Sequence, residues 1–396
     1  MAASVIHVLQ KNDYATHHLL TLPSDPLPDL APSSLRLQSK ILGLTTNNLT
    51  YARLGHLLGW WDIHPLPSNT PAPFNDSKQY GRISAWGYAE IIASTVPGIP
   101  IGKSVLGYLP IGTLPVDVEV KDAGYKNQLL VLNPHRQHLW IIYNRLELCP
   151  PIPEMEAEYG RDFLGWDALM WGLFATSYNL STYGFAWEDA NRIHPSGIGD
   201  WSADDANLDD ATVVCLSGSG KTAMAFAYSL RQCRPQAHQP KFVIAVCSGA
   251  SKQMAEDSKF YDKAVLYSDD VATKDLLVKS GTSRVILIDF GARAGATATW
   301  ESTLSTLPPS IPFSKIFVGT EVKVQKPEEA SKRMAQLGEH IVVNASLLRE
   351  KGIESGGDAY LEKWGKDIGE FKRKGGISSM KLNDEVPASV GLVYRI

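Results

Sequence analysis

The chain has 396 residues, of which 44% are hydrophobic and 20% charged, with 38 Lys and Arg against 42 Asp and Glu and a formal net charge of −4. This length exceeds what one hydrophobic core usually supports, so we expect two domains, and the composition excludes a disordered or collagen-like chain. The charge balance leaves no basic surplus for binding nucleic acid.

Cysteines and targeting signals narrow the class of protein further. The four cysteines are scattered and form no Cys-x-x-Cys pair, which excludes a disulfide framework and a four-cysteine zinc site. Residues 1–12 lack the pattern of a secretory signal, and no apolar run reaches the ~18 residues that a membrane helix needs. These features predict a cytoplasmic protein that has no membrane partner.

The first part of the chain is predicted to be rich in β-strands. Short alternating apolar runs, separated by Gly and Pro, extend from residue 34 to about 120 and indicate a small barrel. The strands that we expect are residues 35–44, 89–94, 104–108 and 115–120. Prolines at positions 150, 151 and 153 indicate a linker, after which apolar residues at helical spacing predict a helix over 154–183.

The second part alternates between strands and helices from residue 212 onward. Such alternation is typical of βαβ units, which form a parallel sheet covered on both faces. We expect strands at residues 212–216, 242–247, 264–267, 284–289 and 315–318, and helices at 221–232, 251–259, 274–279, 297–307 and 359–373. The predicted domains are therefore residues 1–150, completed by 321–396, and residues 151–320 inserted between them.

A glycine-rich turn joins the first predicted parallel strand to its helix. It consists of Ser217, Gly218, Ser219, Gly220, Lys221 and Thr222. Small residues let the backbone approach an anion, and the start of a helix offers free N–H groups, so the segment predicts a phosphate site. The simplest alternative is a tight turn that binds no ligand.

Two specific motifs compete for this turn. The second half of a Walker A loop matches well, but Cys215 stands where that motif has its leading glycine. A Rossmann turn would place Ser217, Gly220 and Ala223 at its three small positions. We favour the Rossmann interpretation because of the sequence that follows the next strand.

That following sequence lies where a dinucleotide fold contacts the adenine ribose. It contains Ser248, Ser251 and Lys252 and has no Asp or Glu. An acidic residue would hold the 2′-hydroxyl of NAD, whereas hydroxyls and a lysine suit the 2′-phosphate of NADP. The sequence therefore predicts NADP(H) as the cofactor.

Several segments carry a resemblance to a known superfamily. Residues 46–55, 86–90 and 101–107 resemble the Asn-containing active-site segment and barrel strands of zinc-free medium-chain dehydrogenases/reductases (MDR), of the quinone-reductase and enoyl-reductase kind. Residues 219–223 and 289–291 match in the second half. More closely, the chain resembles an MDR-like branch, frequent in fungi and bacteria, that carries a domain of unknown function. The resemblance implies an α/β fold, with a GroES-like β-barrel domain and a Rossmann domain built on a doubly wound parallel sheet.

The resemblance also implies which residues act. It places Asn47, Asn48 and Tyr51 beside a nicotinamide bound between the two domains, with Tyr51 as the source of a phenolic proton. The alternative is that the two asparagines form a turn and that Tyr51 packs half-buried. Zinc-dependent members have Cys near position 46 and Gly-His-Glu near position 87, and this chain has neither, so we expect no metal.

Three functions stay open from the sequence. The first is an NADP(H)-dependent reductase of an α,β-unsaturated carbonyl or quinone-like small molecule, for which the resemblance suggests a place in fungal secondary metabolism. The second is an MDR-fold cyclase, isomerase or lyase that works by acid/base chemistry on a polyketide-like substrate. The third is a P-loop nucleotide-binding protein. The resemblance also suggests a homodimer through an edge strand at residues 315–318.

Overall fold

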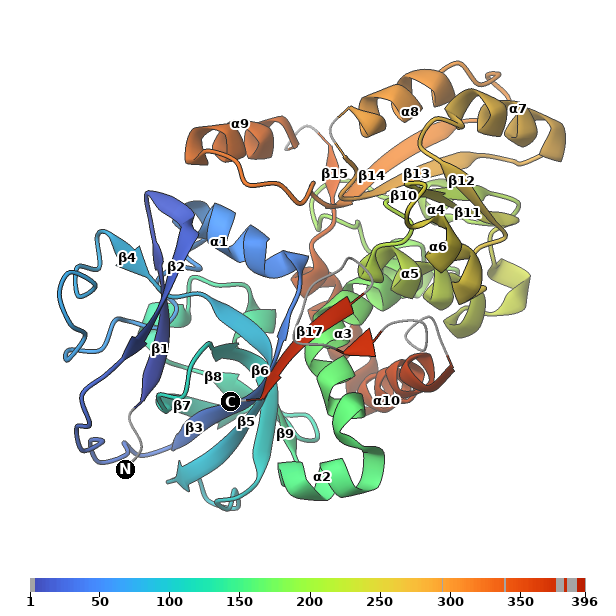
Figure 1. Cartoon of the computed structure of the whole chain (residues 1–396). Helices are drawn as coiled ribbons and strands as arrows, with labels where there is room; N and C mark the ends of the chain where they lie inside the picture. Colours follow the sequence, from blue (N-terminus) through green and yellow to red (C-terminus); the bar gives the residue numbers. More distant parts are fainter. Residues whose placement is uncertain (1–3, 294, 338–339, 375–380, 383–389, 396) are drawn as a thin grey trace. The chain divides into compact units, whose positions relative to one another are not determined.

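The computed structural model describes residues 4–293, 295–337, 340–374, 381–382 and 390–395 (Figure 1). The chain folds into two compact units. Unit 1 comprises residues 1–171, 324–333 and 382–396, and unit 2 comprises residues 172–323 and 334–381. The domain boundaries expected from the sequence stay a prediction. Within the described ranges, no helix is both long enough and apolar enough to cross a membrane.

Unit 1 contains an eight-stranded sheet in the order β16-β17-β3-β5-β6-β9-β8-β7, which closes because β3 also pairs with β7. Alternate residues of these strands face a common apolar core, which includes Leu37, Ile91 and Val105. The small barrel predicted from alternation is therefore present. The strands are β3 (Ser34–Leu44), β5 (Ser84–Ser94), β6 (Ser104–Pro110), β7 (Val116–Asp122), β8 (Gln128–Val131), β9 (Arg145–Cys149), β16 (Lys381–Leu382) and β17 (Val390–Arg395).

Unit 1 also contains elements that the sequence patterns did not predict. A second, three-stranded sheet has the order β2-β1-β4, and a helix follows β3 directly. The predicted helix over 154–183 is interrupted at Gly160, whose backbone φ is +85°, a conformation that favours glycine and ends the first helix. The additional elements are β1 (Val5–Gln10), β2 (Asp13–Thr21), β4 (Tyr80–Gly81) and α1 (Thr46–Leu58). The predicted helix is present as α2 (Ile152–Tyr159) and α3 (Arg161–Asn179), the second of which continues into unit 2.

Unit 2 is built on a six-stranded parallel sheet in the order β12-β11-β10-β13-β14-β15. Numbered from its own first strand, this is the 3-2-1-4-5-6 order of a Rossmann fold, with the switch point between β10 and β13. The predicted fold class, a barrel plus a doubly wound parallel sheet, is confirmed. The strands are β10 (Thr212–Leu216), β11 (Phe242–Cys247), β12 (Lys263–Leu266), β13 (Val285–Phe290), β14 (Phe313–Gly319) and β15 (Ile341–Val342).

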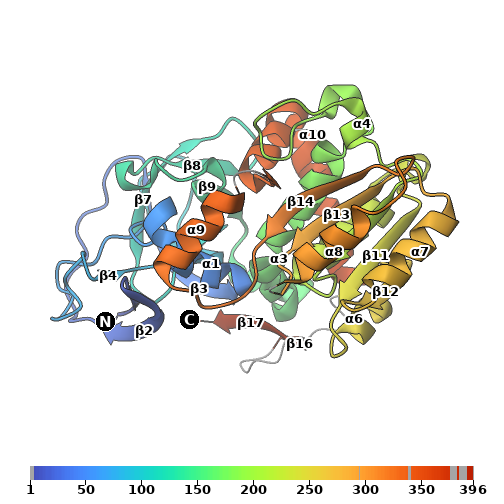
Figure 2. The same cartoon turned by 90° about the horizontal axis from the view of Figure 1, so that it is seen from above.

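Helices cover both faces of this sheet. In Figure 1, α7 and α8 lie on one face and α5 and α6 on the other, and Figure 2 shows α8 from above, lying over the strands. Trp300 of α8 and Leu277 of α7 belong to the same buried cluster as Val214 and Leu287 of the sheet. These four helices are α5 (Lys221–Tyr228), α6 (Lys252–Ser258), α7 (Asp270–Ser280) and α8 (Ala296–Leu304). Unit 2 also contains α4 (Ala203–Ala206) and α10 (Ala345–Lys374), which breaks at Gly357, while α9 (Pro327–Leu337) belongs to unit 1 up to Arg333.

One predicted feature of the sheet is wrong. The strand at residues 315–318 was expected to be an edge available for dimerisation, but β14 pairs with β13 on one side and with β15 on the other. Its backbone groups on both sides are therefore used within the chain. The sequence did not show this because β15 has only two residues, Ile341 and Val342.

Candidate functional site

The predicted phosphate site lies at the carboxyl end of β10, where four residues connect the strand to α5. Ser217, the first of them, has a φ of +60°, in the left-handed region that glycine normally occupies. Gly218 donates its N–H to the carbonyl of Val246 at 3.0 Å. A Cβ on Gly218 would lie 2.6 Å from the Cβ of Ala245. The turn is therefore packed directly against β11.

Groups from the two ends of β12 and from the segment after β13 hold this turn in place. Ser217 N–H donates to the Tyr267 hydroxyl at 3.1 Å, and Ser217 Oγ donates to the carbonyl of Gly291 at 3.3 Å. The Tyr261 hydroxyl donates to the carbonyl of Gly218 at 2.6 Å. The strained φ of Ser217 is thus fixed by its surroundings, as strained backbone at functional sites usually is.

The start of α5 carries features that suit an anion. Among the described residues no side chain caps the helix, so the N–H groups of its first turn have no capping partner there. Within the described part of the chain, the half-buried Lys221 has no hydrogen-bond or ion-pair partner for its ammonium group, and burial lowers its pKa. An anion at this position would offset the cost of leaving that charge unpaired.

The loop after β11 is joined to the turn through serine hydroxyls. Ser219 Oγ donates to Ser251 Oγ at 2.9 Å, and Ser251 Oγ lies 2.9 Å from Ser248 Oγ. Lys252 forms an i,i+4 ion pair with Glu256 at 3.5 Å, and both side chains are partly exposed. The structure therefore brings the nine predicted cofactor-binding residues into one region of unit 2.

The P-loop interpretation disagrees with this geometry. Cys215, at the leading-glycine position of that motif, lies inside β10 and pairs with Ala245 and Ile288, so no long loop is left to wrap a phosphate. Asp289, near the end of β13, stands where a P-loop protein has its magnesium-binding Walker B aspartate. Its Oδ1 accepts the N–H groups of Gly291 and Ala292 at 2.8 and 2.7 Å, and its Oδ2 accepts Thr297 Oγ1 at 2.6 Å. This buried carboxylate is fully used within the fold.

The three predicted catalytic residues lie on α1 in unit 1. Asn48 completes a capping box: its Oδ1 accepts the N–H of Thr45 at 2.8 Å, and its Nδ2 donates to the carbonyl of Ser84 at 3.1 Å. Asn47 donates its backbone N–H to Thr45 Oγ1 at 3.2 Å. The side chain of Asn48 therefore anchors α1 to β5, and its catalytic role stays a prediction.

Tyr51 lies one turn further along α1, inside an aromatic cluster. Its side chain is 4% exposed, and its ring contacts those of Trp60 and Tyr108 edge-on, with centroids 4.8 and 5.0 Å apart. Its hydroxyl accepts the indole N–H of Trp86 at 3.2 Å and also hydrogen-bonds with the side chains of Tyr143 and Asn47. Burial raises the pKa of Tyr51 to about 12, so the phenol keeps its proton at neutral pH.

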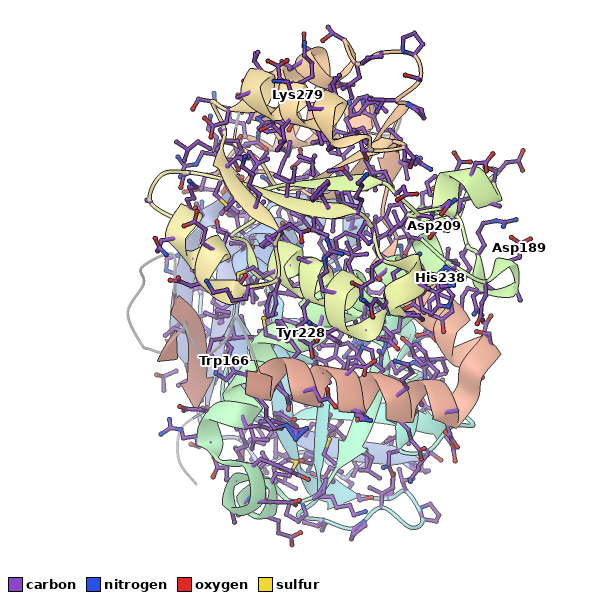
Figure 3. The ribbon with its side chains drawn as sticks, turned by 90° about the vertical axis from the view of Figure 1, so that its right-hand side faces the viewer. Trp166, Asp189, Asp209, Tyr228, His238 and Lys279 are labelled. Atoms are coloured by element: carbon purple, nitrogen blue, oxygen red, sulfur yellow. The ribbon has the colours of Figure 1, made fainter. Side chains whose placement is uncertain are left out.

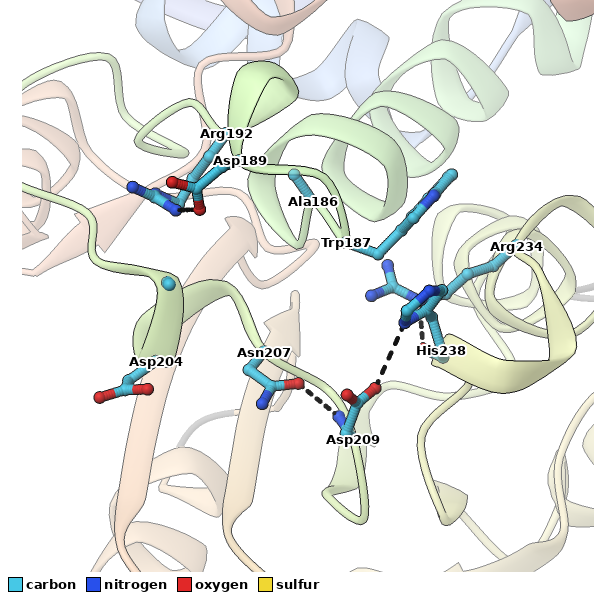
Figure 4. Close-up of a pocket in the computed structure, with 10 residues that line it drawn as sticks. Ala186, Trp187, Asp189, Arg192, Asp204, Asn207, Asp209, Arg234 and His238 are labelled. Atoms are coloured by element: carbon cyan, nitrogen blue, oxygen red, sulfur yellow. Dashed lines mark hydrogen bonds and ion pairs between the residues drawn. The ribbon is translucent and has the colours of Figure 1, made fainter.

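A polar pocket in unit 2 was not anticipated from the sequence. It has a volume of about 200 Å³ and lies beside the segments that precede β10 and β11, so it is at the opposite end of the sheet from the glycine turn (Figure 4). The guanidinium of Arg234 lies 4.9 Å from the centre of the Trp187 ring, and His238 lies 3.7 Å from a carboxylate oxygen of Asp209. Figure 3 shows Asp189, Asp209 and His238 in one region of the molecule. The residues that line this pocket are spread over some fifty positions of the sequence and form no motif, so no sequence signal predicted the pocket.

Among the described residues, no three His, Cys, Asp or Glu side chains lie close enough together to hold a metal ion.

Comparison with known sequences identifies one family. The profile of a family described as "Protein of unknown function (DUF2855)" matches residues 42–387, which is most of the chain. A search of curated proteins gave no significant match.

Comparison with solved structures returns proteins that include a mitochondrial 2-enoyl thioester reductase. The complex of Etr1p with NADP and crotonyl-CoA has a TM-score of 0.53 and 11% identity, and the alignment covers 98% of this chain and 94% of that one. The mitochondrial 2-enoyl thioester reductase Etr1p/Etr2p heterodimer from Candida tropicalis has a TM-score of 0.52 and 9% identity, with the same coverage. CurA from Vibrio vulnificus in complex with NADPH has a TM-score of 0.50 and 14% identity, with 96% and 91% covered. This likeness confirms the MDR-type fold that the resemblance implied.

Proposed function

We propose that this chain, which belongs to the DUF2855 family of proteins of unknown function, is an NADP(H)-dependent reductase of an α,β-unsaturated carbonyl or quinone-like small molecule. The proposal goes beyond the fold, because fold alone does not determine function. It rests on the residues at the carboxyl ends of β10 and β11 and on the properties of Tyr51.

The observation that carries the proposal is the chain of hydroxyl groups from Ser219 through Ser251 to Ser248. It joins the turn after the first strand, where a Rossmann fold holds the pyrophosphate, to the loop after the second strand, where it holds the adenine ribose. The sequence between Ser248 and Lys252 contains no carboxylate. Hydroxyls and lysines in this position suit a 2′-phosphate, which a carboxylate would repel.

The surrounding residues also fit an anionic cofactor. Lys221 offers an unpaired cation at the start of α5, within the part of the chain that the structure describes, and the first N–H groups of that helix are uncapped. Gly249 has open space around it, since a Cβ there would meet no atom within 4 Å. Lys252, although paired with Glu256, has an exposed head group that a phosphate could engage. These groups would hold the pyrophosphate and the 2′-phosphate.

When bound, NADPH supplies the hydride for reduction of a conjugated double bond. The proton that completes such a reduction would come from Tyr51, which the raised pKa keeps protonated. Hydrogen bonds with Trp86, Tyr143 and Asn47 fix the position of the Tyr51 hydroxyl. Asn48 acts indirectly, because its side chain fixes the start of α1, the helix that carries Tyr51. Support of a weaker kind comes from Etr1p and CurA, whose structures contain NADP or NADPH.

Titration of the full-length protein with NADPH tests the proposal. We expect saturable binding, and we expect Lys221→Met to weaken it about 10- to 100-fold, because a charge-assisted hydrogen bond contributes about 1.5–3 kcal/mol. Lys279→Met is the matched control. Lys279 lies in the last turn of α7 (Figure 3), before the amino end of β13 and so at the other end of the sheet. This variant should bind NADPH as the wild type does.

Turnover is tested by NADPH consumption with enone, enoyl thioester and quinone substrates. Consumption with at least one of these substrates, reduced strongly in Tyr51→Phe, is the expected result. A protein that binds neither NADPH nor NADH would refute the proposal and favour acid/base chemistry on the same fold. Binding that is equally weakened by Lys221→Met and Lys279→Met would refute the assignment of the site.

A further inference from the structure

The polar pocket of unit 2 is small and is formed by one part of the chain. Its lining comes from residues 186–238, so it belongs to unit 2 alone (Figure 4). Its volume of about 200 Å³ is below the roughly 300–1,000 Å³ that is usual for drug-sized ligands, so only a small molecule fits. The lining residues are Ala186, Trp187, Asp189, Arg192, Ala203, Asp204, Asn207, Asp209, Arg234 and His238.

Two helices end in a wide turn beside this pocket. After α3, the N–H of Phe185 donates to the carbonyl of Leu180 at 2.9 Å. After α5, the N–H of Arg234 donates to the carbonyl of Ser229 at 3.1 Å. Both bonds span five residues, as in a π-helix, and such turns are rare and frequent at functional sites. The first turn leads into Ala186 and the second ends at Arg234, and both of these residues line the pocket.

Arg234 brings a buried positive charge to the pocket. The residue is 3% exposed, and its Nε donates to the carbonyl of His238 at 2.5 Å. Its Nη1 donates to the carbonyls of Ser181 and Phe185 at 2.9 and 2.5 Å. Nη2 makes no hydrogen bond with a described residue, and it is not sealed from solvent. Figure 4 shows the guanidinium end of Arg234 pointing toward the other lining residues, so a molecule in the pocket can reach Nη2.

Burial does not remove this charge. It lowers the pKa of Arg234 to about 10, and the nearby carboxylate of Asp209 opposes part of that shift. The guanidinium is therefore a cation at neutral pH, and no described carboxylate forms an ion pair with it. Because an unpaired buried charge is costly, an anionic group bound at Nη2 would stabilise this arrangement.

Asp209 supplies a charge of the opposite sign. Its side chain is 52% exposed and lies 3.7 Å from His238 Nδ1, and its carboxylate accepts no hydrogen bond from a described residue. Figure 4 shows Asp209 on the same side of the pocket as Arg234. Asp189 and Arg192 lie on the other side and form an ion pair with each other. The pocket therefore offers one available cation and one available anion.

A ligand that carries a single charge fits this pocket poorly. The carboxylates of Asp189, Asp204 and Asp209 all line it, so they would repel a simple anion. A simple cation would leave the charge of Arg234 unpaired. We propose that the pocket binds a small amino acid, whose carboxylate pairs with Arg234 Nη2 and whose ammonium group pairs with Asp209. This site does not depend on NADP(H) or on the reductase proposed above, because it lies at the other end of the sheet from the glycine turn.

Calorimetric titration of the full-length protein without cofactor tests the proposal. L-Alanine, β-alanine and 4-aminobutyrate carry both charges at increasing separation, whereas propionate lacks the ammonium group and propylamine lacks the carboxylate. We expect at least one of the three amino acids to bind at least tenfold more tightly than propionate and propylamine. The reason is that a charge-assisted hydrogen bond usually contributes about tenfold or more to affinity.

Two variants locate the site. Asp209→Asn keeps the shape of an exposed side chain and removes its charge, so it should weaken binding of that amino acid about tenfold and should not weaken binding of propionate. Asp275→Asn, at an exposed position of α7 outside the pocket, is the matched control and should bind as the wild type does. Arg234→Gln should abolish binding of the amino acid.

Three results would overturn the proposal: no amino acid binds, propionate or propylamine binds as tightly as the best amino acid, or Asp209→Asn binds that amino acid as the wild type does. Should Arg234→Gln fail to fold, because Arg234 joins the ends of the two wide turns, Asp209→Asn still decides. Its side chain is exposed and carries no hydrogen bond from a described residue, so the substitution leaves the fold intact.

Discussion

Gly218→Ala tests whether the turn after β10 owes its position to direct packing against β11. The added methyl group would lie 2.6 Å from the Cβ of Ala245 and 2.8 Å from its Cα. Carbon atoms in contact prefer a separation of about 3.5–4.0 Å, so the turn would have to move by roughly 1 Å. The obstacle is backbone and a Cβ, which cannot rotate away.

The cost follows from what such a movement disrupts. Overpacking a well-packed interior typically costs about 1–3 kcal/mol. The shift would also stretch the hydrogen bond from Gly218 N–H to Val246 and the one from Tyr261 to the Gly218 carbonyl, each worth about 1 kcal/mol. We therefore expect Gly218→Ala to lower the free energy of unfolding of unit 2 by about 2–4 kcal/mol.

Hydrogen exchange of peptides from β10 to β13, measured at increasing urea concentration, reports the stability of that sheet separately from unit 1. The matched control is Gly249→Ala, in the loop after β11, where a Cβ would meet no atom within 4 Å. That variant should remain within about 0.5 kcal/mol of the wild type. A Gly218→Ala protein as stable as Gly249→Ala would show that the turn is not held in the way described.

Three further predictions concern other side chains. Lys252→Glu should reduce the preference for NADPH over NADH at least tenfold in paired titrations, and an unchanged preference would remove Lys252 from the 2′-phosphate site. Lowering the pH from 6.5 to 5 should decrease the free energy of unfolding by about 2 kcal/mol through His7. The pKa of His7 is about 3 in the folded protein, so over this pH range the imidazole takes up a proton in the unfolded chain but not in the folded one. The difference in this pH dependence between wild type and His7→Leu isolates the effect, and identical slopes would contradict it. Tyr51→Phe should destabilise unit 1 by about 1–3 kcal/mol, since the buried indole N–H of Trp86 loses its acceptor, and thermal unfolding of the variant measures this.

The central strands of the parallel sheet of unit 2, β10, β11 and β13, could be predicted from the sequence because they are buried on both faces. The expected strands at 212–216 and 242–247 agree with β10 and β11 residue for residue. Such strands appear as short uninterrupted apolar runs between turn residues, and this signal does not depend on distant partners. The same holds for the glycine turn, whose residues are adjacent in the chain.

Elements with mixed polar composition were not predictable in this way. The helix α1 contains two asparagines, two threonines and a glycine, all weak helix formers. It is stabilised by its capping box and by contacts with β5, and only the spacing of Thr45 and Asn48 hinted at it. A cavity of about 710 Å³ in unit 1 is lined by His7 and His17 of the β1–β2 hairpin and by Leu49 of α1, segments that are separated along the sequence. No local pattern could bring those residues together.

The proposed function requires that NADP(H) bind at the carboxyl ends of β10 and β11. Hydrogen exchange of the full-length protein with and without NADPH tests it most directly. We predict that NADPH slows exchange in peptides that cover residues 217–223 and 248–252. We also predict no change at the polar pocket around Trp187 and His238, at the opposite end of the sheet. Unaltered exchange in the first two segments, or protection confined to that pocket, would contradict this claim.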